Sequence, residues 1–95
     1  MKQNFTIADF LPLTSVSSLK TDLKTRFQSR RKEAQLSREE LASRSGVSYG
    51  SIRRFESTGE ISLGSLLKIS QAIGLLDEFN ALFKQPIIKN LKDLK

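Results

Sequence analysis

Residues 36–57 have the sequence LSREELASRSGVSYGSIRRFES, which predicts two short helices joined by a tight turn. Ser37 is expected to cap the first helix, and Glu40 three residues later completes a capping box. Gly46 is expected to end that helix, because glycine adopts the left-handed conformation without steric cost. Ser48 is then the expected cap of the second helix.

The apolar residues of the same stretch are spaced to hold the two helices together across the turn. Ala42 is small enough to lie where the helices cross closely. Four larger residues surround the turn and are expected to be buried: Leu41, Val47, Ile52 and Phe55. These features together, within residues 38–57, predict a helix-turn-helix, with an ordinary helix hairpin as the alternative.

Helical signals continue on both sides of this stretch. A preceding helix is expected to run to about Ala34, with one apolar face made by Leu19, Leu23, Phe27 and Ala34. Ser62 is expected to cap a fourth helix that Gly74 ends, and residues 76–83 predict a brief fifth helix. The chain is therefore predicted to be an all-α, compact five-helix domain. The expected boundaries are an arm at 1–15, the domain at 16–84 and a tail at 85–95.

The composition of the 95-residue chain excludes several classes of enzyme. It contains no Cys, no His and no Trp, so it offers no thiolate nucleophile, no zinc-thiolate site and no imidazole base. Metalloenzymes, Ser-His-Asp hydrolases and Cys-His proteases are excluded on this ground. Glu39 and Glu40 point about 100° apart on a helix and cannot form an acid–base pair. We expect no enzymatic activity, no metal, no cofactor and no small-molecule substrate.

The positive charge is concentrated in one part of the chain. The net charge at pH 7 is +6, from 16 basic and 10 acidic residues. Residues 20–54 hold ten of the basic and four of the acidic residues, which accounts for the whole excess. This concentration predicts a surface that binds a polyanion, with solubility as the alternative explanation.

The sequence gives no signal for a membrane or for export. No run approaches the roughly 20 apolar residues of a membrane span. Residues 1–9 lack the apolar segment of a signal peptide. We therefore expect no membrane contact and a cytoplasmic location, with which the absence of Cys is consistent.

Residues 36–48 and 51–56 resemble the Xre family, the phage Cro and repressor type of DNA-binding domain. The resemblance covers roughly residues 19–76. It implies a lambda-repressor-like fold, double-stranded DNA as the partner, a homodimer and a palindromic operator. The sequence departs from the family in the loop after Glu56, where several bases are usual and this chain has Glu60 instead.

The resemblance implies which side chains meet DNA. The positions of the base-reading residues are Ser48, Tyr49, Gly50 and Arg54. The guanidinium of Arg54 matches O6 and N7 of guanine, although a phosphate contact is its alternative. For Tyr49, the alternative to a DNA contact is a ring that lies on the protein surface. For Gly50, the alternative to a close approach to DNA is a glycine that the helix merely tolerates. The positions expected to bind phosphate are Arg31, Ser37, Arg38, Ser51 and Arg53.

The family also implies a structural pair between Arg31 on the first helix and Glu56 at the end of the third. Apolar residues after the fourth helix are the expected dimer interface, unless they complete the monomer core. They are Leu76, Phe79, Leu82 and Phe83.

Three functions remain open from the sequence. A dimeric transcriptional repressor is the first. An antitoxin is a special case of it, in which the arm (Phe5, Ile7, Phe10) and residues 87–94 would face a toxin protein. A protein-interaction module that retains the fold without DNA binding is the alternative, which Glu60 favours and Arg38, Arg53 and Arg54 oppose.

Overall fold

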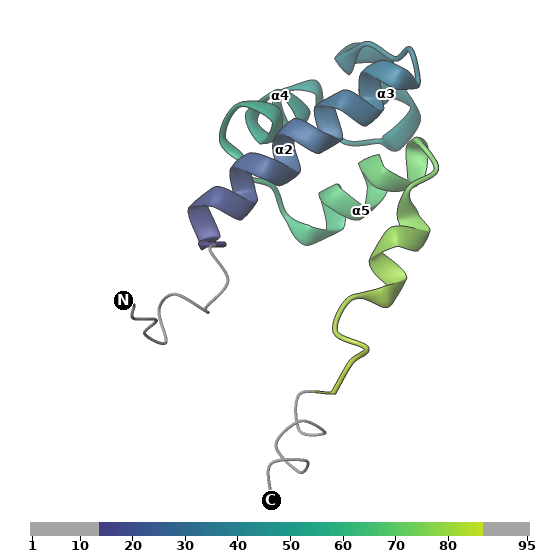
Figure 1. Cartoon of the computed structure of the whole chain (residues 1–95). Coiled ribbons are helices and arrows are strands. Elements are labelled where there is room, and N and C mark those ends of the chain that lie inside the picture. The colour runs from purple at the N-terminus through teal and green to yellow at the C-terminus, as the bar shows by residue number, and fades with distance from the viewer. Residues whose placement is uncertain (1–13, 87–95) are drawn as a thin grey trace, which may run out of the picture.

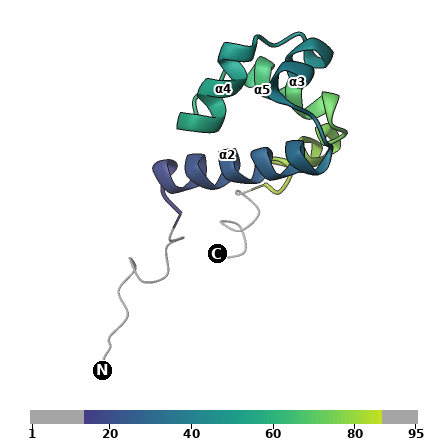
Figure 2. The ribbon, with the colours of Figure 1, turned by 90° about the horizontal axis from the view of Figure 1, so that it is seen from above.

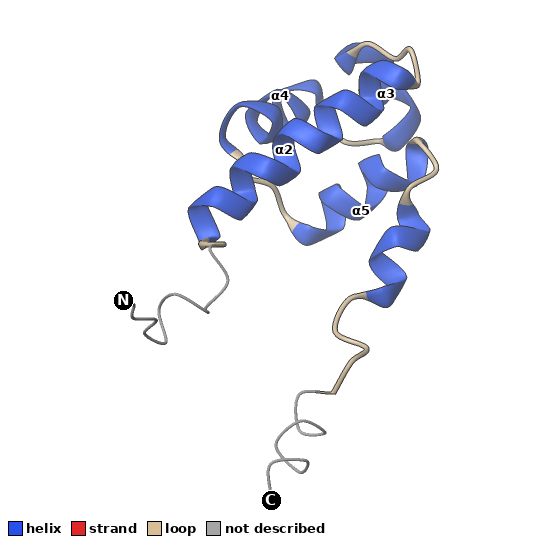
Figure 3. Cartoon of the chain, in the orientation of Figure 1, coloured by secondary structure: helices blue, strands red, loops and turns tan. Residues whose placement is uncertain are grey.

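The computed structural model describes residues 14–86, which form four α-helices and one 3-10 helix (Figure 1). The elements are α2 (Val16–Glu33), α3 (Arg38–Ser45), α4 (Tyr49–Thr58), α5 (Leu63–Ala72) and η1 (Leu76–Ala81). Short loops connect them, and no strand occurs among these residues (Figure 3). The predicted all-α, five-helix fold is confirmed for the described part of the chain.

A serine caps each of the four α-helices. The hydroxyl of each accepts a hydrogen bond from the backbone N–H three residues later, at 3.0–3.1 Å. These caps are Ser15, Ser37, Ser48 and Ser62. The Glu40 carboxylate in turn accepts a hydrogen bond from the Ser37 N–H at 2.8 Å, so the predicted capping box is confirmed. This bond from Ser37 lowers the pKa of Glu40.

Two glycines set the path of the chain around α4. Gly46 ends α3 with φ +78°, and Gly59 ends α4 with φ +81°, both in the left-handed region. A Cβ at Gly46 would meet nothing within 4 Å. A Cβ at Gly59 would lie 2.9 Å from the Cβ of Lys20, so α2 and the end of α4 approach closely only because no side chain intervenes.

The core lies where α3 and α4 meet. Leu41, Val47, Ile52 and Phe55 are all buried, which confirms the anchors predicted around the turn. Phe27 of α2 packs edge-on against Phe55, with ring centroids 5.6 Å apart. The other buried apolar residues of the cluster are Leu36 and Ile69. In Figure 2, α2 lies as a long rod along one side of the layer formed by the other helices.

The prediction for the apolar face of α2 is mostly wrong. Phe27 is buried, but Leu19 and Leu23 remain 41% and 42% exposed, and Ala34 is exposed. The reason is that α2 packs mainly on α4, so this part of the apolar face has no helix over it.

The element after α5 also differs from prediction. It is a 3-10 helix that ends at Ala81, and Phe83 follows in the left-handed region with φ +63°. Expectations for residues 1–13 and 87–95 lie outside the described residues. None of the helices described between residues 14 and 86 is long and apolar enough to cross a membrane.

Candidate nucleic-acid interface

The outer face of α4 carries the predicted base-reading residues. Ile52, Phe55 and Glu56 are buried and fix which side of the helix faces the core. The residues on the remaining surface of its first two turns are exposed: Ser48, Tyr49, Gly50, Arg53 and Arg54. A Cβ at Gly50 would meet nothing within 4 Å, so the backbone of α4 is open to solvent there.

The N-terminus of α4 is closed by a pair of serines. Ser48 Oγ accepts the Ser51 N–H at 3.1 Å and donates to Ser51 Oγ at 2.9 Å. Ser51 is half-buried in this arrangement. The first N–H groups of a helix have no partner within it and favour an anion nearby. The capped end of α4 is therefore chemically suited to approach a phosphate.

A buried ion pair joins α2 to α4. The Nε of Arg31 donates to Glu56 Oε2 at 2.8 Å, and its Nη2 donates to Oε1 at 2.9 Å. The Nη1 of Arg31 donates to the Leu36 carbonyl at 2.8 Å. The side chains of Arg31 and Glu56 are 7% and 0% exposed. This bidentate pair therefore fixes α2, the loop before α3 and α4 relative to one another.

Two further side chains share the Glu56 carboxylate. Arg38 at the start of α3 donates from Nε to Oε1 at 2.9 Å, and Gln28 donates to the same oxygen at 3.3 Å. Arg38 remains 33% exposed, whereas the carboxylate is fully buried. Two guanidinium groups surround one carboxylate, so the cluster keeps one positive charge, and its exposed portion is that of Arg38.

The cluster also sets the ionisation of its members. Burial by itself raises the pKa of Glu56, but the hydrogen bonds from Arg31 and Arg38 outweigh it, so the pKa lies below its ordinary value of 4.5. The hydrogen bond to Glu56 likewise raises the pKa of Arg31. Glu56 is therefore ionised at neutral pH despite its burial.

The expected phosphate-binding residues differ in their placement. Arg31 is buried, and three of its five N–H donors bond to Glu56 and to the Leu36 carbonyl, so we assign it a structural role instead of a phosphate contact. Ser37 lies exposed at the N-terminus of α3, next to Arg38. Ser51 and Arg53 lie on α4. Of the two remaining arginines, Arg38 is half-buried at the N-terminus of α3, and Arg53 is exposed in the second turn of α4.

Glu60, the acidic residue in the loop after α4, has a basic partner. The carboxylate of Glu60 forms an ion pair with the Lys20 ammonium of α2. This hydrogen bond lowers the pKa of Glu60, and the nearby charge of Arg54 lowers it further. Lys20 thus offsets the charge that Glu60 would present beside Arg54.

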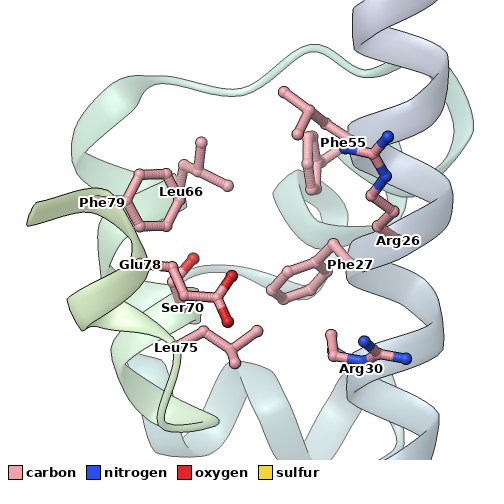
Figure 4. A pocket seen from close by; sticks show the side chains of 10 residues that line it. Arg26, Phe27, Arg30, Phe55, Leu66, Ser70, Leu75, Glu78 and Phe79 are labelled. Atoms are coloured by element: carbon pink, nitrogen blue, oxygen red, sulfur yellow. The ribbon is translucent and has the colours of Figure 1, made fainter. Parts of the chain in front are cut away.

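Three of the four predicted dimer residues are exposed. Leu76, Leu82 and Phe83, which lie in η1 or directly after it, are 36%, 54% and 96% exposed. Phe79 is half-buried and lines a pocket together with Phe27 and Leu66 (Figure 4). The described chain does not use the three exposed side chains for its own core.

The sequence analysis did not single out two residues that lie beside the candidate site. Gln28 supports Glu56, and no pattern singles it out among the polar residues of α2. Ser57 is exposed and lies one turn beyond Arg54 and two turns beyond Gly50, so helical spacing could have placed it on the same face. Its hydroxyl donates to the Arg53 carbonyl at 2.8 Å.

Comparison with known proteins agrees with this arrangement. Residues 27–78, more than half of the chain, match the model of the helix-turn-helix family. No curated protein and no solved structure matches the chain. The matched residues run from the middle of α2 into η1 and include the whole Glu56 cluster.

Proposed function

Because the chain belongs to the Xre-like helix-turn-helix family of DNA-binding regulators, we propose that it is a dimeric repressor of a palindromic operator. The observation that carries this proposal is the exposed face of α4, with Tyr49, Gly50 and Arg54 held outward by the buried Ile52 and Phe55. A helix of this kind enters the major groove with its first residues against the base edges.

In the proposed complex, Ser48, Tyr49, Gly50 and Arg54 read bases. Arg54 donates its two-pronged guanidinium to guanine O6 and N7, a contact worth about 1–3 kcal/mol of discrimination. Gly50 lets the backbone of α4 approach the groove, because no side chain stands between them. Tyr49, 39% exposed, contacts a thymine methyl or a phosphate.

Phosphates are bound at the edges of the groove by Ser37, Arg38, Ser51 and Arg53. Arg38 lies at the first turn of α3, where free backbone N–H groups add to its charge. Its Nε is held by Glu56, so the guanidinium needs little ordering when it meets a phosphate. Arg31 acts through Glu56 as a positioning residue.

Two copies are proposed to bind adjacent half-sites about 34 Å apart. The apolar surface of Leu76, Leu82 and Phe83 supports an interface between copies, because its side chains are exposed in the single chain. Binding that covers a promoter is sufficient for repression. Within this proposal the chain is an antitoxin if its arm and tail bind a toxin protein.

The alternative function is a protein-interaction module, and Glu60 is the observation that favours it. An acid beside Arg54 weakens the attraction of this surface for phosphate. The ion pair between Glu60 and Lys20 partly neutralises this acid, so it weakens phosphate binding less.

Selection from random duplex DNA by the purified protein tests the proposal. A palindromic motif with two half-sites supports a dimeric reader of the major groove. Absence of binding even at low salt contradicts it and favours the interaction module. The dimer is checked separately by sedimentation of the Phe83→Ser variant, which should be monomeric and still folded because Phe83 contacts nothing in its own core.

A further inference from the structure

The chain after α4 places one acid near two cations. Glu60 forms an ion pair with Lys20 of α2, and the side chains of Lys20 and Glu60 are 38% and 47% exposed. The charge of Arg54 also reaches this carboxylate, because it adds to the lowering of the Glu60 pKa that the hydrogen bond from Lys20 causes. The ion pairs within residues 14–86 do not include one between Glu60 and Arg54. The carboxylate is therefore anchored by Lys20 and lies in the field of Arg54 without binding it.

Local hydrogen bonds tie the backbone of Glu60 to the side of α4 that carries Arg54. Thr58 lies one turn beyond Arg54 on the same face of the helix. Its hydroxyl donates to the Arg54 carbonyl at 2.8 Å and accepts the Glu60 N–H at 3.1 Å. Between them, Gly59 turns the chain in the left-handed conformation and lets α2 approach with Lys20. The position of Glu60 is therefore fixed relative to both cations.

A similar arrangement occurs at the other acid beside α2. There Arg31 of α2 anchors the carboxylate of Glu56, which also accepts a hydrogen bond from the Nε of Arg38 at 2.9 Å. Arg38 stays 33% exposed next to this acid. At both acids, a cation of α2 anchors a carboxylate near an arginine of the proposed DNA-binding face. The contact with that arginine is present at Glu56, whereas it is still open at Glu60.

A guanidinium group can bind a base and a carboxylate at the same time. It has five N–H donors in a planar fork, and O6 and N7 of guanine accept from only two of them. A carboxylate at another edge fixes the plane of the fork, so less freedom is lost when the guanidinium meets the base. We propose that Glu60, anchored by Lys20, is a positioning residue that directs the guanidinium of Arg54 toward guanine in the DNA complex. This inference rests on the proposed function, in which Arg54 reads a base.

This role gives Glu60 two opposite effects on DNA binding. Its charge repels the phosphates of every duplex and weakens binding regardless of sequence. Its contact with Arg54 strengthens binding only where a guanine faces the guanidinium. Glu60 therefore lowers the affinity for non-specific DNA and raises the preference for one base pair in each half-site. An acid that only repelled DNA would produce the first effect without the second.

The test measures affinities for the selected operator, for operators with one base pair changed and for an unrelated duplex. Glu60→Gln should bind the unrelated duplex more tightly than the unaltered protein does. Its preference at the base pair read by Arg54 should fall about 2- to 10-fold in each half-site, the cost of ordering a long side chain. Preferences at the other base pairs should remain. Glu78→Gln makes the same change at an exposed acid of η1 and should alter none of these affinities.

The Arg54→Ala background separates this inference from the proposed function. There, the further change Glu60→Gln should leave every base preference as it is and still raise the affinity for all sequences. If Arg54→Ala loses a base preference but Glu60→Gln alone keeps every one, Glu60 does not position Arg54, and only this inference is overturned. If Arg54→Ala keeps every base preference, the proposed reading of bases by Arg54 is wrong, and the inference is overturned with it.

Discussion

Arg31 donates two hydrogen bonds to Glu56, from Nε at 2.8 Å and from Nη2 at 2.9 Å, and both side chains are buried. Their backbones belong to α2 and α4, 25 residues apart in sequence. The pair therefore determines how the helix that carries Tyr49 and Arg54 lies on the rest of the domain. Arg38 donates to the same carboxylate, so one acid holds both a buried arginine and a partly exposed one.

Removal of this acid should destabilise the protein strongly. Glu56→Ala leaves the charge of Arg31 buried without an acidic partner, and breaking a buried ion pair in this way costs about 3–5 kcal/mol. Denaturation by urea measures the loss. Glu39→Ala, which removes an exposed acid of α3, is the control and should change stability by less than about 0.5 kcal/mol. Equal losses in the two variants would contradict the role assigned to Glu56.

The same carboxylate should make stability depend on pH in the acid range. The pKa of Glu56 is lower in the folded protein than its ordinary value of 4.5. The unfolded chain therefore binds protons first as the pH falls below about 4.5, and the free energy of unfolding decreases from there downward. Glu56→Gln should flatten this dependence, as measured by thermal unfolding between pH 3 and pH 7. If Glu56→Gln leaves the pH dependence of stability unchanged, other carboxylates cause that dependence.

Two glycines with the same backbone conformation should respond differently to alanine. Gly46→Ala introduces only left-handed strain, about 1–2 kcal/mol, because its Cβ would meet nothing. Gly59→Ala adds a contact at 2.9 Å with the Cβ of Lys20, so it should be the more destabilising of the two. Urea midpoints of both variants decide the comparison. If both variants lose the same stability, α2 moves away from the new Cβ at residue 59 without an energetic cost.

Gly50 and Gly64 occupy the second position of α4 and α5 and form a second matched pair. A Cβ fits without contact at either position, so both alanine variants should raise stability, by up to about 1 kcal/mol. Only Gly50→Ala should also alter DNA affinity, because the proposed groove contact involves that backbone. Unfolding and binding measured together separate the two effects. Unchanged binding of Gly50→Ala would remove Gly50 from the interface.

Arg38 should contribute to DNA affinity without sequence preference. Arg38→Ala removes one proposed phosphate contact, so the slope of log affinity against log salt should become shallower by about 1. Affinity should fall similarly for all duplex sequences. Arg30→Ala, which removes an exposed arginine of α2 outside the proposed contacts, should leave the slope unchanged.

The sequence predicts the local structure of this domain well. The serine caps, the left-handed Gly46 and the four anchors around the turn follow from nearest neighbours in sequence, and all are present. Packing over longer distances was less predictable. Periodicity places Leu19 and Leu23 on an apolar face but does not say that α2 packs mainly on α4 and leaves them exposed.

The candidate site shows the same limit. Helical spacing separates the exposed Gly50 and Arg54 from the buried Ile52. The partner of Arg38 depends on the tertiary fold, because charge alone does not indicate which of several acids an arginine meets. Gln28 enters the cluster for the same reason, and no local signal marks it.

The central claim is that α4 reads bases through Arg54. It is tested most directly by measuring the affinities of Arg54→Ala and Arg53→Ala for the selected operator and for operators with one base pair changed. The account predicts that Arg54→Ala loses discrimination at one symmetric position in each half-site, by about 1–3 kcal/mol. Arg53→Ala should weaken binding to all sequences alike. If Arg54→Ala keeps every base preference of the unaltered protein, α4 does not read the operator through this residue.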